Sequence, residues 1–209
     1  MNIFENKDIK FDKGLSLGEI KEIEEIYSIV FPESLKNCLM HALPVSKGFY
    51  NWRDKSLQNI EFIRNEINYP LDYIRKNPEE VYWKDEWGEK PKSITEIRDF
   101  VFNLTNDAPV IIPVYLHRYI PMGVSDNPPV ISVYGSDVIY YGKDLDDYFD
   151  NEFGENGIRT DLLSNYQRIP FWSDIMWFKF EIEYVLRNKL WDFLTRKRKK
   201  KQNIIGMTE

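Results

Sequence analysis

Apolar residues spaced three and four positions apart predict two helices near the start of the chain. Ser16 and Glu19 have the spacing of a capping box, which opens the first helix, and this helix should end near Tyr27. The second helix opens at Pro32, and its apolar face consists of Leu35, Cys38, Leu39 and Ala42. Cys38 is therefore expected in the core as an unreactive thiol.

Two further helices are expected before residue 110, and each has a recognisable boundary. The first starts near Leu57 and should be interrupted by Pro70, with a shorter helix behind the proline. The second starts at Ser93, which has capping-box spacing to Glu96, and ends near Asn106. Four or five helices should therefore precede any strand.

After position 109 the pattern changes to β-branched and aromatic residues. The segment "VIIPVYLHRYI" indicates strand structure, although Pro113 lacks an amide hydrogen and so suits an edge, a bulge or a strand start. The segment "PVISVYGSDVIYYG" predicts a hairpin, because glycine at the first position of the Gly135-Ser136 loop suits a type II′ turn.

The C-terminal third has two competing patterns. Apolar and charged residues alternate as in a strand from Phe178, whereas apolar positions from Leu186 repeat as in a helix. We favour a helix over 173–199. The expected fold class is α+β, with helices packed around a mostly antiparallel sheet, in a single domain with a helical basic C-terminal extension. The boundaries are a lead segment at 1–14, the domain at 15–175 and the extension at 176–209.

Composition indicates a folded protein of the cytoplasm. The 209 residues are 43% hydrophobic and 15% aromatic, which is far from the composition of disordered chains. The single cysteine, Cys38, excludes an intrachain disulfide, and the N-terminus lacks the apolar run of a signal peptide. No apolar run approaches the roughly 18 residues that a membrane span needs.

Charge favours a basic protein partner. The net charge of -6 includes six consecutive cations, Arg196 to Lys201; without them 22 basic residues face 34 acidic ones, a charge of -12. An acidic body disfavours nucleic acid as the main ligand, because phosphate binding depends on clustered cations. Only the basic tail, Arg196 to Lys201, could contact nucleic acid or anionic lipid, and a solvated terminus is the favoured explanation for it.

The acidic stretch "DLDDYFDNEFGE" fits a helix start better than a metal site. A calcium loop needs glycine at its sixth position, where Phe149 stands. As a helix, the stretch has Asp144 as N-cap, Asp146 and Asp147 in its first turn, and aromatic residues facing inward. We therefore expect no metal, no cofactor and no catalytic residue, although carboxylates that meet in space could still form an active site.

Four segments in this order resemble the SMI1/KNR4 family of the SUKH superfamily: "FPESLKNCL", "PVSKGFYNWRD", "IPVYLHRYIP" and "NPPVISVYGSDVIYYGKDLDDYFDNEF". The resemblance covers roughly residues 15–153, with "FWSDI" at 171–175 similar to the usual last element, and makes 15–175 an SMI1/KNR4-like domain. It implies an α+β fold and a role in binding proteins. Bacterial members are regarded as immunity proteins that neutralise toxins, and fungal members as regulators of cell-wall synthesis.

Our leading hypothesis is a non-catalytic immunity-type protein that neutralises a basic, possibly nuclease, toxin domain through an acidic, aromatic-rich face. A regulatory scaffold that binds an endogenous protein is the alternative, and an uncharacterised enzyme comes third. The candidate partner-binding residues are Trp52, Arg53, Asp54, Asp137, Tyr141 and Asp144, since tryptophan and arginine are typical anchors and aspartates suit a cationic target. Equally, Trp52 could be core and Asp54 could cap the helix at Leu57.

Overall fold

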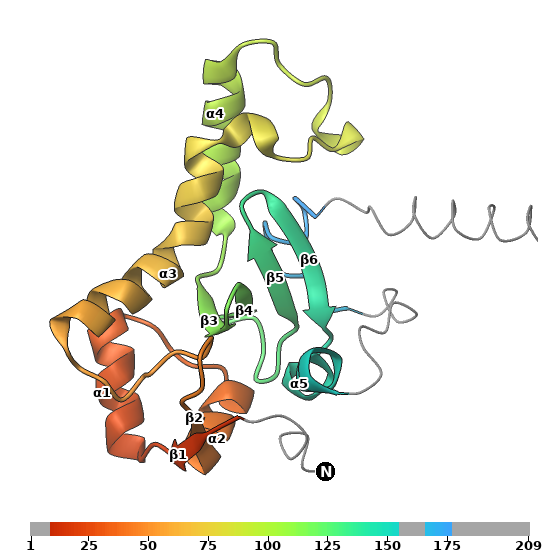
Figure 1. The fold of residues 1–209 in the computed structure, drawn as a ribbon. Coiled ribbons are helices and arrows are strands. Elements are labelled where there is room, and N and C mark those ends of the chain that lie inside the picture. The colour runs from red at the N-terminus through yellow and green to blue at the C-terminus, as the bar shows by residue number, and fades with distance from the viewer. Residues whose placement is uncertain (1–8, 155–165, 177–209) are drawn as a thin grey trace, which may run out of the picture. The chain divides into compact units, whose positions relative to one another are not determined.

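The computed structural model describes residues 9–154 and 166–176, which form a mixed α+β fold (Figure 1). The chain divides into two units, Met1–Met176 and Trp177–Glu209, and the described residues all lie in the first. No helix in these residues is long and apolar enough to span a bilayer. The principal elements are β1 (Phe11–Lys13), α1 (Leu17–Tyr27), α2 (Glu33–His41), β2 (Ala42–Pro44), α3 (Leu57–Lys76), α4 (Ile94–Leu104), β3 (Ile111–Tyr115), β4 (Arg118–Pro121), β5 (Val130–Tyr134), β6 (Asp137–Gly142) and α5 (Leu145–Phe153).

The larger sheet is an antiparallel meander in the order β3-β4-β5-β6. Pro113 lies on the edge strand β3, next to an irregularity in the pairing with β4, so the predicted edge or bulge position is confirmed. The predicted β5–β6 hairpin is also confirmed, with Gly135 at φ +62° in its turn. The segment that we expected to be one strand is instead two, because the chain turns at Leu116-His117.

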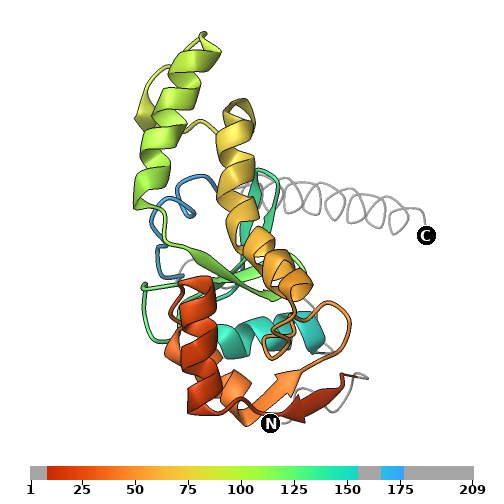
Figure 2. The same cartoon turned by 90° about the vertical axis from the view of Figure 1, so that its left-hand side faces the viewer.

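Both faces of this sheet are covered, which explains why its strands are apolar at almost every position. On one face, Ile112, Ile120 and Val130 join a core that includes α1, α2 and α5. Their sequence neighbours Ile111, Tyr119 and Ile131 point to the other face, where they pack with α4 and with residues 169–176. Figure 2 shows α1, α2 and α5 gathered on one side.

Two predicted helix starts are confirmed in detail. Ser16 accepts a hydrogen bond from the Glu19 amide, and the Glu19 carboxylate accepts one from the Ser16 amide at 2.8 Å, which completes the capping box. At α5, the Asp144 carboxylate accepts from the Asp147 amide at 2.8 Å. The acidity of this stretch therefore serves the helix start, where the dipole favours negative charge.

The smaller sheet corrects three predictions. Three-residue strands β1 and β2 pair antiparallel, so strands do precede helices, and Phe11–Lys13 is a part of the fold that we had assigned to the lead segment. Ala42 begins β2 instead of completing the second helix, which ends at His41. The chain passes close to α2 here, because a Cβ on Gly14 would lie 1.9 Å from the Met40 carbonyl oxygen.

Pro70 does not interrupt α3, contrary to prediction. The helix continues to Lys76, with Pro70 buried on the same side as Ile63 and Ile74. A proline costs one backbone hydrogen bond, and burial of these apolar side chains compensates for that loss.

The helix predicted to start at Ser93 is confirmed but its capping box is not, and the helix start predicted at Ser173 is wrong. Ser93 precedes α4, but its side chain makes no capping hydrogen bond, so the second capping box does not form. Residues 173–176 are not helical: Ser173 accepts a hydrogen bond from the Ile169 amide through its hydroxyl, within a turn. The remainder of the helix predicted over 173–199 lies outside the described residues.

Candidate protein-binding surface

Trp52 is a core residue in this fold. Its side chain is 3% exposed and makes edge-to-face contacts with the rings of Tyr27 at 5.5 Å and Phe31 at 5.1 Å between centroids. A side chain in this position can reach a partner only if the core opens. We therefore drop Trp52 as a partner-binding anchor.

Arg53 and Asp54 follow Trp52 in the same loop, and both form hydrogen bonds within the fold. Arg53 pairs with Glu19 at 2.7 Å and also donates to the Lys13 and Gly14 carbonyls at 2.8 and 3.1 Å. The bond from Arg53 is the largest cause that lowers the pKa of Glu19 to about 2, followed by the Ser16 amide. Asp54 accepts from the Ser56 amide at 2.9 Å, and Ser56, not Asp54, is the N-cap of α3.

The three hairpin candidates do not lie at one place. Asp137 begins β6 at the turn, whereas Tyr141 and Asp144 lie at the opposite end of that strand, beside α5 (Figure 1). At about 3.3 Å per residue, Asp137 and Asp144 are separated by roughly 20 Å. These candidates therefore cannot form one compact contact.

Tyr141 takes part in a half-buried cluster near α5. The Arg118 guanidinium lies 3.8 Å from the centre of the Tyr141 ring and pairs with Glu152 at 3.0 Å. Arg118 also donates to the Ser132 hydroxyl at 3.1 Å. These contacts connect β4, β5 and β6 to α5, so Tyr141 has a structural role.

Exposed aromatic and apolar side chains gather elsewhere, where α3 meets the turns of both hairpins. We call this the α3–hairpin surface. The most exposed members are Tyr134 at 74%, Phe62 at 50%, Leu116 at 48% and Tyr69 at 44%. With the half-exposed Tyr73, the surface consists of Phe62, Tyr69, Tyr73, Leu116 and Tyr134. Figure 1 shows the β5–β6 turn at the end of the sheet that lies beside α3.

Leu116 is held in an unusual conformation at the β3–β4 turn. Its φ of +46° lies in the left-handed region that leucine seldom adopts. Its amide donates to the Gly48 carbonyl at 2.8 Å, and its carbonyl accepts from the Tyr50 hydroxyl at 2.6 Å. Both backbone groups are therefore fixed, and the apolar side chain is presented to solvent in one orientation.

Ring contacts connect the other members of the surface. Tyr50 stacks on Phe62 at 5.9 Å, and its single hydroxyl proton is shared between the Leu116 carbonyl at 2.6 Å and the Glu66 carboxylate at 3.1 Å. Tyr69 contacts Tyr73 at 5.8 Å. The β5–β6 turn closes against α3, because a Cβ on Gly135 would lie 3.1 Å from the Tyr73 ring.

Carboxylates border these rings. Glu80 accepts hydrogen bonds from the Tyr73 hydroxyl at 2.9 Å and from the Ser136 hydroxyl at 3.3 Å, and the first of these is the main reason that the pKa of Tyr73 is raised. Asp137 lies opposite Tyr134 across the hairpin. Within residues 9–154 and 166–176, Glu66, Glu80 and Asp137 form no ion pair, so their negative charge is available to a cationic ligand.

His117 completes the border beside Tyr134. The two rings are 5.8 Å apart in an edge-to-face arrangement. Burial and the nearby Arg118 charge lower the pKa of His117. The imidazole is therefore neutral at pH 7 and does not offset the carboxylates.

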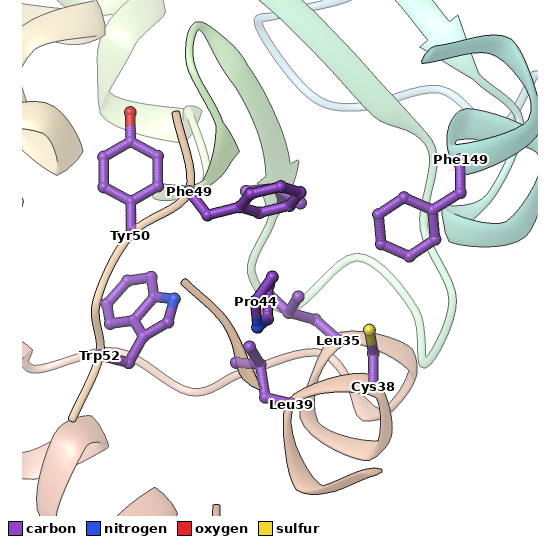
Figure 3. A pocket seen from close by; sticks show the side chains of 9 residues that line it. Leu35, Cys38, Leu39, Pro44, Phe49, Tyr50, Trp52 and Phe149 are labelled. Carbon is purple, nitrogen blue, oxygen red and sulfur yellow. The ribbon is translucent and has the colours of Figure 1, made fainter. Parts of the chain in front are cut away.

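The described residues also enclose a small internal cavity. It lies between α2, the Trp52 loop and α5 (Figure 3). Its volume of about 10 Å³ leaves room for about one water molecule. Burial raises the pKa of Cys38 beside it to about 11. The lining is apolar and consists of Leu35, Cys38, Leu39, Pro44, Phe49, Tyr50, Trp52, Val114 and Phe149. Among the described residues, no cluster of acidic, histidine or cysteine side chains could hold a metal ion.

Sequence reasoning found Asp137 at the border of the α3–hairpin surface and none of the five members of the surface. Tyr69 and Tyr73 could have been identified from the sequence as neighbours, because a four-residue spacing places both on one helix face. Leu116 was not, since the turn at this position was read as continuous strand.

We compared the chain with protein-family models, curated proteins and solved structures, and nothing matches it. The resemblance to the SMI1/KNR4 family thus stays a prediction.

Proposed function

We propose that the protein is a protein-binding module of immunity type, which neutralises a basic toxin domain through the α3–hairpin surface. One observation carries the proposal: exposed tyrosine, phenylalanine and leucine side chains lie together, bordered by carboxylates that form no ion pair with any other described residue. Aromatic side chains at the centre of an interface supply most of the affinity, and charge at the rim steers association.

The rigidity of the surface supports this role. Leu116 is fixed through both backbone groups, and Tyr73 is fixed through its hydroxyl, so little conformational entropy is lost when a partner binds. The acidic body, with a charge of -12 without the tail, favours a cationic partner such as a nuclease, whose cleft must attract a polyanion.

The test is association kinetics with the candidate toxin domain encoded beside the gene. Raising salt from about 0.05 to 0.5 M should slow association at least tenfold and change dissociation much less. Tyr134→Ala and Phe62→Ala should each speed dissociation about tenfold or more, and Glu80→Gln should mainly slow association. Val30→Ala is the matched control, because Val30 is 63% exposed and lies outside the surface.

A salt-independent association rate, or a partner with an acidic binding face, would favour the regulatory scaffold instead. Surface variants that bind like Val30→Ala would remove the α3–hairpin surface from the proposal.

A further inference from the structure

A tyrosine hydroxyl without a hydrogen-bond partner lies beneath the α3–hairpin surface. Tyr119 of β4 is only 1% exposed, and its ring packs in the core that includes Ile74 of α3. In the described part of the chain, no hydrogen bond reaches its hydroxyl. The side-chain atoms there that are both sealed from solvent and unpartnered are the Ser34 and Tyr148 hydroxyls, so the Tyr119 hydroxyl is not sealed. A polar group at the end of a buried ring is thus left for a ligand.

The half-buried Glu66 carboxylate lies beside this hydroxyl. Burial is the main reason that the pKa of Tyr119 is raised, and the charge of Glu66 is the next cause, followed by Tyr69. Glu66 and Tyr69 are three positions apart on α3, so their side chains share one face of the helix. The helix therefore brings a carboxylate and a second tyrosine to the end of the Tyr119 ring that reaches solvent.

Exposed aromatic rings continue along this face of α3. Phe62 lies four positions before Glu66, and Tyr69 and Tyr73 lie three and seven positions after it. The face of an aromatic ring attracts a cation. Because one face of Phe62 is already stacked on Tyr50, Tyr69 is the ring best placed to receive a cation at Glu66.

The polar groups around Glu66 offer more acceptors than donors. Only its Oε2 atom accepts a hydrogen bond from another described residue, the Tyr50 hydroxyl, whose proton is shared with the Leu116 carbonyl. Its Oε1 atom and the oxygen of Tyr119 can still accept. A ligand that fits must donate several hydrogen bonds, carry positive charge and present a flat face to a ring. A guanidinium group has all three properties, whereas an ammonium group lacks the flat face.

We propose that the α3–hairpin surface receives an arginine side chain of the partner at Glu66. The guanidinium pairs with the Glu66 carboxylate, stacks on the Tyr69 ring and donates a hydrogen bond to the Tyr119 hydroxyl. The inference rests on the proposed function, because the arginine belongs to the basic protein that binds there. Arginine held among aromatic rings is a frequent source of binding energy in interfaces.

The capped amino acid N-acetyl-arginine methylamide tests the site without a toxin, by NMR titration of the tyrosine ring signals of the full chain. We expect saturable binding with a Kd on the order of 1–10 mM. The corresponding lysine derivative lacks the planar group, and the citrulline derivative lacks the charge. Each should therefore bind at least about fivefold more weakly. No saturable binding of the arginine derivative, or equal affinity for either analogue, would overturn the proposal.

Two variants assign the binding to these side chains. Glu66→Gln, which keeps an acceptor for Tyr50, should weaken the arginine derivative at least about fivefold. Glu61→Gln is the matched control, because Glu61 is an exposed carboxylate on the same helix, about 140° away around its axis. Tyr119→Phe should weaken binding about threefold and leave the urea midpoint unchanged, since the lost hydroxyl has no partner in the described fold. Binding like that of the parent protein by Glu66→Gln or by Tyr119→Phe would contradict the arginine site.

Kinetics with the candidate toxin domain separate this inference from the proposed function. A toxin domain that binds Glu66→Gln as tightly as Glu61→Gln would leave the proposed function standing and overturn the arginine site. Binding of the arginine derivative that depends on Glu66, together with no binding of the toxin domain, would support the site and overturn the immunity role.

Discussion

The ion pair between Arg53 and Glu19 should stabilise the fold in a pH-dependent manner. Lowering the carboxyl pKa from 4.5 to about 2 corresponds to at most about 3.4 kcal/mol of stability. The two side chains remain 32% and 30% exposed, and the Ser16 amide supplies part of the effect. Solvent screening therefore reduces the expected Arg53–Glu19 coupling to about 1 kcal/mol.

A double-mutant cycle with Glu19→Gln and Arg53→Met measures this coupling by urea unfolding at pH 7. A depressed carboxyl pKa stabilises the folded state above the unfolded value of 4.5, and this stability is lost as the pH falls from 4.5 through about 2. At pH 7 the parent protein should have a higher unfolding free energy than Glu19→Gln. More than half of this difference should therefore be lost by about pH 3.

The neighbouring pair, Lys55 and Glu22, is the matched control for this cycle. It joins the same two segments, but its side chains are 44% and 49% exposed, so its coupling should stay below about 0.5 kcal/mol. Equal coupling in the two pairs would refute the argument. A Glu19→Gln effect that is unchanged between pH 7 and pH 3 would refute the assigned pKa.

Three further outcomes are expected. Trp52→Ala should lower the unfolding free energy by about 3–5 kcal/mol in urea, and an unchanged midpoint would mean that the indole is not in the core. With its pKa raised from 9.0 to about 11, Cys38 should react with a disulfide reagent at pH 8 roughly 100-fold more slowly than an exposed thiol, and rapid labelling would contradict its burial. Gly142→Ala should lower the thermal midpoint, because its Cβ would lie 2.5 Å from the Tyr148 backbone. Gly18→Ala is the control: no atom lies nearer than 3.9 Å to its Cβ, so it should raise stability by about 0.5–1 kcal/mol. Equal effects of the two substitutions would refute the steric argument.

Most features set by residues close in sequence could be predicted, with the capping box at Ser93 as the exception. The capping box at Ser16, the turn at Gly135 and the cap at Asp144 each depend on side chains within three or four positions, and each forms as expected. The α+β class followed from the same local signals.

Features set by tertiary packing could not be predicted. Pro70 reads as a helix breaker unless the burial of the helix that contains it is known. Strands β1 and β2 are three residues long and about thirty residues apart, so neither shows a periodic pattern. Trp52 was equally compatible with a loop anchor and with core, because exposure of a loop side chain depends on what packs over it.

The candidate site was missed for the same reason. Its members come from α3 and from two separate turns, and only the folded chain brings Phe62, Leu116 and Tyr134 together. Asp137 was found because it belongs to a hairpin that the sequence does predict.

The burial of both faces of the larger sheet has a consequence for how this protein can diverge. Substitutions on either face meet a packed core, so they are constrained by volume and apolarity alone. Leu116 and Tyr134 lie in or next to turns at the ends of the strands, where their side chains are exposed to solvent. A change of side chain there costs little stability. Side chains at the ends of the strands, where we propose that a partner binds, can thus change while the strands themselves stay the same.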